Sequence, residues 1–111
     1  MRVIPHPATD QLTLPGVLHA MSDPVRLGIV EALRDGDELP CGKLDVPVTK
    51  STLSHHLKVL RDAGLTQTRA QGVHRYVSLR RGDLEDRFPG LLDCVLEHST
   101  QPAVRLAVHL A

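Results

Sequence analysis

Residues 49–64 constrain the fold more than any other part of the chain, because they specify one amphipathic helix together with both of its ends. Thr49 is a side-chain N-cap candidate, and Gly64 suits the position just after a last helical turn. Three leucines recur at i, i+4 and i+7 and form an apolar stripe: Leu53, Leu57 and Leu60. We therefore predict a helix over residues 50–63 that buries one face and leaves the other polar.

Positive charge is concentrated on this helix and on the segment that follows it. Between Lys50 and Arg81 the chain has seven Lys or Arg residues and a single acid, Asp62, which is a net charge of +6. The whole protein is formally neutral, so the remaining residues carry −6. A neutral chain that gathers its cations on one face favours a polyanionic partner, and nucleic acid is the one we expect.

Two further helices are predicted before the basic helix. Asp23 is an N-cap candidate and Pro24 suits the first helical position, so we predict a helix over residues 25–34. Apolar residues at helical spacing predict an earlier, shorter helix: Leu12, Leu14, Val17, Leu18 and Met21. Two prolines and a glycine restrict residues 37–48 to a single helical turn, over residues 41–44.

The part of the chain after Gly64 predicts a β-hairpin and one more helix. Strand-like runs at 65–69 and 73–79 flank a turn at 70–72. Pro89 then resets the chain before a helix with four apolar residues: Leu91, Leu92, Val95 and Leu96. The predicted fold class is mainly α with a β-hairpin, a winged helix-turn-helix with a three-helix core plus a wing.

Length and composition bound the organisation of the chain. The 111 residues suit one domain, which we place at 11–100, between a flexible N-terminal arm at 1–10 and a C-terminal tail at 101–111 that is either strand or helix. No apolar run is long enough to cross a bilayer and the first residues do not read as a signal peptide, so no membrane partner is expected. Two cysteines are too few for a disulfide framework and fit a reducing cytoplasm.

The predicted helix-turn-helix assigns a role to the basic face. Its second helix enters the major groove of double-stranded DNA with its N-terminal residues at the base edges. Hydroxyl, imidazole, ammonium and guanidinium groups suit phosphate oxygens and base edges, and the DNA-binding candidates carry these groups or an amide: Lys50, Ser51, Thr52, Ser54, His55, Lys58 and Arg61 on the helix, with Arg69, Gln71 and Arg75 on the hairpin. His56, beside Leu57 on the inner side, is expected to pack rather than to read bases.

An enzyme is not expected. The seven histidines are scattered without triad or metal-ligand spacing, and the adjacent His55 and His56 point about 100° apart on a helix. No glycine-rich phosphate loop is present, so we predict no catalytic residue and no cofactor. The remaining rival is a winged helix that binds another protein without touching DNA, and the charge distribution argues against it.

Two segments of the chain resemble the ArsR/SmtB family of bacterial winged-helix repressors: S-D-P-V-R-L at 22–27 and S-T-L-S-H-H-L-K-V-L-R-D-A-G-L at 51–65. The resemblance runs from about Val17 to about Leu96. It implies a homodimer joined by the first and last helices, which binds an inverted-repeat operator and is released by a metal ion or another inducer. It also implies that the hairpin is the wing and that four residues face the major groove: Ser51, Thr52, Ser54 and His55.

The chain departs from the metal-sensing members of that family. Where those members often carry a C-x-C pair, residues 38–44 have one cysteine, Cys41, and a lone thiolate is a poor site for a soft metal. On the last helix Asp93 and Glu97 are four residues apart and share a face, whereas His98 directly follows Glu97 and points away from that face. These four side chains are candidates only, so we predict no metal site and leave the inducer open.

A thiol-redox sensor is the alternative to metal sensing. The two cysteines lie far apart in sequence. Cys94, beside Val95 and Leu96, is expected to be a small buried apolar residue. Cys41, next to a proline and a glycine near a helix start, is expected to be the more reactive of the two.

Overall fold

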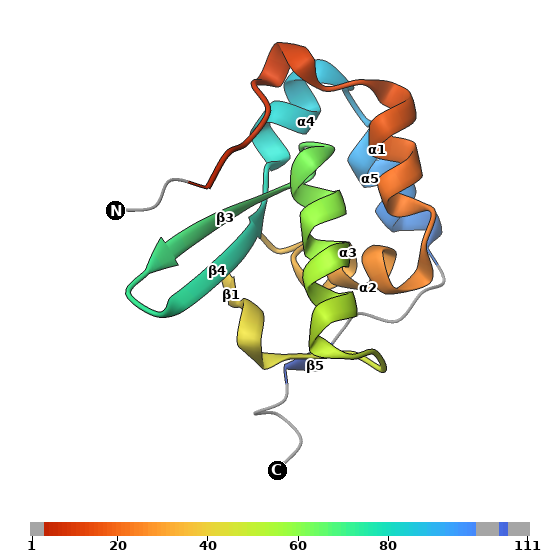
Figure 1. Ribbon diagram of the computed structural model, residues 1–111. Helices are drawn as coiled ribbons and strands as arrows, with labels where there is room; N and C mark the ends of the chain where they lie inside the picture. The colour runs from red at the N-terminus through yellow and green to blue at the C-terminus, as the bar shows by residue number, and fades with distance from the viewer. Residues whose placement is uncertain (1–3, 100–104, 107–111) are drawn as a thin grey trace.

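The computed structural model describes residues 4–99 and 105–106 and confirms a mainly α fold with a β-hairpin wing (Figure 1). The α-helices are α1 (Leu14–Met21), α2 (Pro24–Ala32), α3 (Lys50–Asp62), α4 (Arg81–Arg87) and α5 (Leu91–His98). Two 3₁₀ turns lie at Thr9–Gln11 and Cys41–Lys43. The strands are β1 (Leu39–Pro40), β2 (Leu44–Asp45), β3 (Thr66–Gln71), β4 (His74–Leu79) and β5 (Arg105–Leu106).

The basic helix α3 forms where the local signals predict it. The Thr49 hydroxyl oxygen accepts a hydrogen bond from the Thr52 backbone N–H at 3.2 Å, which satisfies one of the free N–H groups of the first turn. Gly64 follows the helix with φ of +85°, a left-handed conformation that favours glycine. Leu60 is fully buried, and His56 is buried as well, which confirms that it packs inward.

The helix before it, α2, is also capped as predicted. The Asp23 carboxylate accepts hydrogen bonds from the N–H groups of Val25 and Arg26 at 2.9 and 3.1 Å, and Pro24 is the first helical residue. The helix ends at Ala32, two residues before the predicted end at Arg34.

The first element of the helix-turn-helix is a single 3₁₀ turn over Cys41–Lys43, as the two prolines of this segment predict. The two residues before it form a strand, β1, that the sequence did not indicate. Leu39 lies opposite Val77 and Pro40 opposite Tyr76, so the wing is a three-stranded sheet in the order β1-β4-β3. A two-residue strand has no periodicity to read, and proline is tolerated there because β1 lies at the sheet edge.

The turn of the wing lies two residues later than predicted. The β3–β4 ladder continues from the Thr66–Leu79 pair to the Gln71–His74 pair, so Gly72 and Val73 are the turn residues. Gly72 has φ of +61°, which the first residue of a tight hairpin turn requires. The prediction of a turn at 70–72 was therefore wrong, because strand pairing overrode the local turn signal.

The acidic segment after the wing forms a helix of its own, and Pro89 and Gly90 separate it from the last helix. Gly90, with φ of +81°, precedes α5 directly. In the predicted tail the described residues, Arg105 and Leu106, pair with β2 as strand β5, and its other residues lie outside the described part.

The described part of the N-terminal arm contacts the wing and α4. The Thr68 N–H donates to His6 Nε2 at 3.0 Å, and Arg80 Nη1 donates to the Pro7 carbonyl oxygen at 2.8 Å. The Thr9 hydroxyl donates to Asp83 Oδ1 at 2.9 Å. The expectation of a flexible arm did not include these contacts.

The hydrophobic core lies where the helices meet the base of the wing. It is aliphatic, and its largest fully buried apolar side chains lie on or next to α1, α2, α3 and β4: Leu12, Val17, Ile29, Val30, Leu33, Leu60, Leu65 and Val77. This packing holds the inner face of α3 and directs its polar face outward. Among residues 4–99 and 105–106, no helix has both the length and the apolar character that crossing a membrane requires.

Candidate DNA-binding interface

The outward face of α3 carries six of the seven predicted helix residues on the surface: Lys50, Ser51, Thr52, Ser54, His55 and Lys58. Around the cap, the Thr49 hydroxyl oxygen lies 3.1 Å from that of Ser51 and 3.0 Å from that of Thr52. These three hydroxyls form one local network at the start of the helix. Ser54 and His55 lie one turn further along with exposed side chains.

Lys58 makes an ion pair within the same helix. Its Nζ lies 2.6 Å from Asp62 Oδ2, four residues later, and both side chains are more than half exposed. An exposed i,i+4 pair contributes only about 0.3–0.5 kcal/mol. A phosphate oxygen can therefore displace Asp62 at little cost.

Arg61 differs from the other predicted helix residues. It is half-buried, and its Nε is buried without a hydrogen-bond partner in the described part of the chain. Its charge lies close enough to act on His6 and on Cys41. The structure thus separates Arg61 from the exposed face that the other six residues share.

The wing holds Arg69 in a network of its own. Arg69 donates to both carboxylate oxygens of Glu38 at 3.0 and 2.9 Å, and its guanidinium carbon lies 4.7 Å from the centre of the Tyr76 ring. Its Nη1 donates to Gln71 Oε1 at 2.7 Å. The hydrogen bond between the pair lowers the pKa of Glu38 and raises the pKa of Arg69. Of the three predicted wing residues, Arg69 and Gln71 are joined in this network, whereas Arg75 is exposed on β4.

Cys41 is half-buried and is the first residue of the 3₁₀ turn that begins the helix-turn-helix. Burial raises the pKa of the Cys41 thiol, and the nearby charges of Arg75 and Arg61 oppose that effect only in part. The thiolate is the nucleophilic and metal-binding form. The expectation that this cysteine is the more reactive one therefore has no support from its surroundings.

The last helix places its candidate ligands on the surface but does not gather them. Asp93 pairs with Arg81 at 3.0 Å, and the side chains of Glu97 and His98 are exposed. Cys94 is exposed too, with Sγ 3.9 Å from His98 Nδ1, so the expectation of a buried cysteine was wrong. The helix turns Leu92 and Leu96 inward, which leaves position 94 on the outer side. No group of three or more His, Cys, Asp or Glu side chains suited to a metal ion occurs in the parts of the chain that the structure describes.

A buried arginine that the sequence analysis did not single out orients α3. Arg26 Nε donates to the Ala20 carbonyl oxygen at 2.7 Å, and Nη2 donates to that of His19 at 3.3 Å. Its Nη1 lies 3.1 Å from His56 Nδ1. A guanidinium has no acceptor, so His56 Nδ1 accepts this bond and the ring proton resides on Nε2. Arg26 therefore links the end of α1, the start of α2 and the middle of α3.

The signal for this link was present in the sequence. Arg26 precedes Ile29, Val30 and Leu33 by three, four and seven residues, which is the spacing of one helical face. An arginine in register with an apolar stripe is a candidate for burial, and a buried cation requires acceptors.

Comparison with known proteins agrees with this geometry. Residues 21–69 match a helix-turn-helix domain model. The chain is 41% identical over 80 residues to the HTH-type transcriptional regulator YceK of Bacillus subtilis (strain 168). This match covers 69% of this chain and 80% of that protein. It is 35% identical over 76 residues to the arsenical resistance operon repressor of Staphylococcus aureus, and this match covers 68% of this chain and 73% of that protein. A crystal structure of an ArsR family transcriptional regulator has the same fold, with a TM-score of 0.60 and 20% identity over 86% of this chain and 99% of that one.

Proposed function

Because this chain belongs to the ArsR/SmtB family of winged helix-turn-helix transcriptional regulators, we propose that it is a homodimeric repressor that covers promoter DNA in the cytoplasm. The observation that carries the proposal is the exposed, hydroxyl-rich and basic face of α3, set beside a wing that is stiffened by its own network. Relatives of this chain are DNA-binding regulators, which places it with them and not with enzymes.

In the proposed complex α3 lies in the major groove. Ser54 and His55 contact base edges, because both side chains are exposed near the N-terminal end of the helix. Lys50, Lys58 and Arg75 contact phosphate oxygens, and the helix N-terminus adds a favourable partial positive charge. The wing lies along the DNA backbone.

The proposed dimer forms through α1 and α5. Leu14 and Leu18 are four residues apart on α1, and their side chains are 44% and 45% exposed. Val17 and Met21 of α1 and Leu91 and Leu92 of α5 line one small internal space, and the two helices lie side by side in Figure 1. A twofold axis through the outer surface of these two helices places two copies of α3 about one helical turn of DNA apart, which corresponds to an inverted-repeat operator.

DNA binding driven by the basic face is expected to weaken steeply as salt is added. Each phosphate contact releases about 0.9 counterion from duplex DNA, so six contacts give a slope near −5 in log K against log salt concentration. Fluorescence anisotropy with labelled duplex DNA between about 50 and 200 mM salt measures this slope. Absence of binding at the lowest salt, or a slope near zero, would contradict the proposal.

Base reading by α3 predicts different consequences for two kinds of variant. The Ser54→Ala/His55→Ala double variant is expected to reduce the preference for operator over random DNA about tenfold, because lost base contacts remove roughly 1–3 kcal/mol of discrimination. Lys58→Ala and Arg75→Ala are expected to weaken binding to both DNAs about equally, since phosphates carry no sequence information. The preference is measured with an operator sequence that the wild-type protein selects from a random DNA library. The same loss of preference in all the variants would show that α3 does not read bases.

The proposed interface predicts that Leu18→Asp produces a monomer. By symmetry the charge enters the interface twice, and two buried leucine contacts are lost, so we expect the dimer Kd to rise at least about 100-fold. Sedimentation velocity measures the oligomeric state. The matched control is Val73→Asp, because Val73 is a 93% exposed apolar residue at the wing tip, away from α1 and α5. A Leu18→Asp protein that stays dimeric would place the interface elsewhere.

A further inference from the structure

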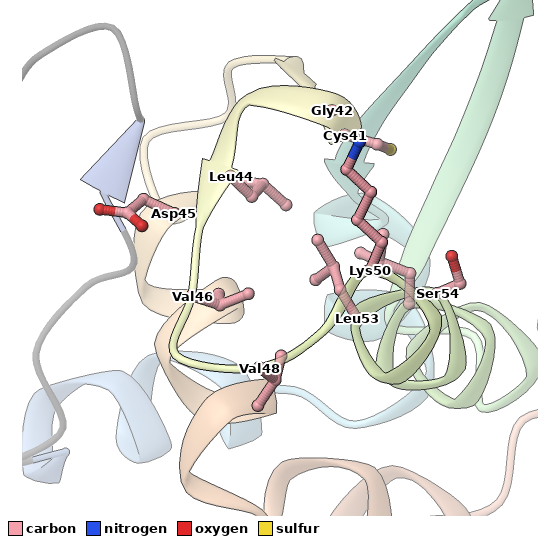
Figure 2. Close-up of a pocket in the computed structure, with 10 residues that line it drawn as sticks. Cys41, Gly42, Leu44, Asp45, Val46, Val48, Lys50, Leu53 and Ser54 are labelled. Carbon is pink, nitrogen blue, oxygen red and sulfur yellow. The ribbon is translucent and has the colours of Figure 1, made fainter.

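A groove of about 320 Å³ lies between the first part of the helix-turn-helix and the start of α3 (Figure 2). Its apolar lining comes from both sides: Leu44 on β2 and Val46 and Val48 on the loop after it, and Leu53 and Leu57 on α3. Figure 2 shows the side chains of Leu44, Val46 and Leu53 directed into this space, whereas the carboxylate of Asp45 points to the opposite side of β2. That alternation is the one a strand imposes on successive residues. The side chains directed into the groove are therefore mostly apolar.

One cation stands at the rim of the groove. The Lys50 side chain extends from the first turn of α3 toward Cys41, across one end of the groove (Figure 2). Lys50 forms no hydrogen bond or ion pair with any residue of 4–99 or 105–106. Burial raises the pKa of Cys41, so the neighbouring thiol is neutral and supplies no counter-charge. The groove thus combines apolar walls with one unpaired positive group.

We propose that this groove binds a small carboxylate with an apolar body, of the kind that a medium-chain fatty acid represents. The carboxylate pairs with the Lys50 ammonium, and the hydrocarbon part lies against the valines and leucines of the lining. The volume falls at the lower end of the range for small-molecule sites, which are mostly apolar with a few placed polar groups. A neutral ligand would leave the lysine unpaired, and an amine would meet a like charge.

The position of the groove connects the ligand to DNA binding. Lys50, Leu53 and Ser54 line the groove, and Lys50 and Ser54 also belong to the exposed face of α3. A bound carboxylate neutralises Lys50 and puts a negative charge beside the DNA phosphates, so it lowers DNA affinity. This second step depends on the proposed function, whereas ligand binding itself does not.

The site is tested first without DNA, by titrating the ¹⁵N-labelled full chain with octanoate and following its amide resonances. Saturable shifts are expected at Leu44, Val46, Val48 and Leu53. Lys50→Met is expected to weaken octanoate binding roughly fivefold, the effect of one ion pair at a surface, while octan-1-ol binding stays unchanged. Lys58→Met, which removes a lysine of the same helix outside the groove, is the matched control.

Four results would overturn the site. One is the absence of saturable shifts up to about 5 mM octanoate, a concentration that fills even a site with millimolar Kd. Another is a set of shifts that lie away from the groove. The third is octylamine binding as tightly as octanoate. Val48→Phe, which narrows the groove, is expected to lose binding of octanoate and octan-1-ol together, and unchanged binding would place the ligand elsewhere.

The consequence for DNA is tested separately by anisotropy. Octanoate is expected to raise the Kd for DNA in the wild-type protein and to have no effect on Val48→Phe. If the ligand-free protein binds no DNA, the proposed function fails while the resonance shifts still decide the site. If octanoate binds in the groove but leaves the DNA Kd unchanged, the site stands and its link to DNA release is refuted.

Discussion

Replacing Gly64 with alanine is expected to lower the free energy of unfolding by about 3 kcal/mol, which corresponds to a fall in Tm on the order of 15 °C. Two effects add at this position. Gly64 has φ of +85°, and holding alanine in that conformation costs about 1–2 kcal/mol. A Cβ there would also overlap Cδ2 of Leu12, and forcing extra volume into a packed core costs about 1–3 kcal/mol.

The surroundings of Gly64 leave little room for relaxation. The N–H groups of Gly64 and Leu65 donate to the carbonyl oxygens of Arg61 and Leu60, each at 3.0 Å, and so close the last turn of α3. On the other side Leu12 is fully buried, and its carbonyl oxygen accepts from Arg87 Nε at 3.0 Å. The overlapping Cδ2 belongs to a fully buried side chain, so it moves aside only by displacing other core atoms.

Gly36→Ala is the matched control for this prediction. Gly36 has φ of +89°, but a Cβ there meets nothing within 4 Å, so only the conformational cost of about 1 kcal/mol is expected. In a Leu12→Ala background, Gly64→Ala is likewise expected to cost only about 1 kcal/mol, because the overlapping atoms are gone. Urea unfolding at fixed protein concentration measures the wild-type protein and four variants: Gly64→Ala, Gly36→Ala, Leu12→Ala and the Leu12→Ala/Gly64→Ala double variant. Equal costs at positions 64 and 36 in the wild-type background would contradict the close contact.

Arg26→Met is expected to lower the free energy of unfolding by a similar amount, about 3 kcal/mol. Methionine keeps most of the length of the side chain but donates no hydrogen bonds, so the bonds from Arg26 to the Ala20 carbonyl oxygen and to His56 Nδ1 are lost. The longer bond to the His19 carbonyl oxygen is lost too, but that oxygen still accepts from the N–H and hydroxyl of Ser22. Hydrogen bonds from a charged donor contribute about 1.5–3 kcal/mol each, and a buried acceptor without a partner adds a desolvation cost. Arg26→Lys is expected to be intermediate, because one ammonium does not reproduce the planar fork.

The control for Arg26 is Lys58→Met, which removes an exposed cation from an i,i+4 pair and is expected to cost less than about 0.5 kcal/mol. A second readout reports directly on the hydrogen bond between Arg26 and His56. Long-range ¹H–¹⁵N NMR of His56 is expected to show the proton on Nε2 in the wild-type protein, and a mixture of tautomers in Arg26→Met. Unchanged stability together with an unchanged tautomer would mean that the arginine does not hold α3 through this histidine.

Local signals were sufficient where a few adjacent residues decide the structure. Thr49, the leucine stripe and Gly64 predicted α3 because capping, periodicity and a left-handed residue all act within one helix. The same holds for Asp23 and Pro24 at α2. The set of exposed residues on α3 followed from the stripe, since a helix that buries one face exposes the opposite one.

The sequence by itself determined the helix-turn-helix, the wing and the concentration of charge on them, because those follow from short-range geometry and composition. Tertiary structure alone decided what pairs across long separations. It shifted the wing turn to Gly72–Val73, brought Glu38 onto Arg69 from 31 residues away, and left Arg61 half-buried with its Nε inside the protein. It also placed Lys50 at the rim of an apolar groove. Such contacts depend on strand register and on the packing of elements that are distant in sequence. The linear order of the residues does not give the distances between these elements in space.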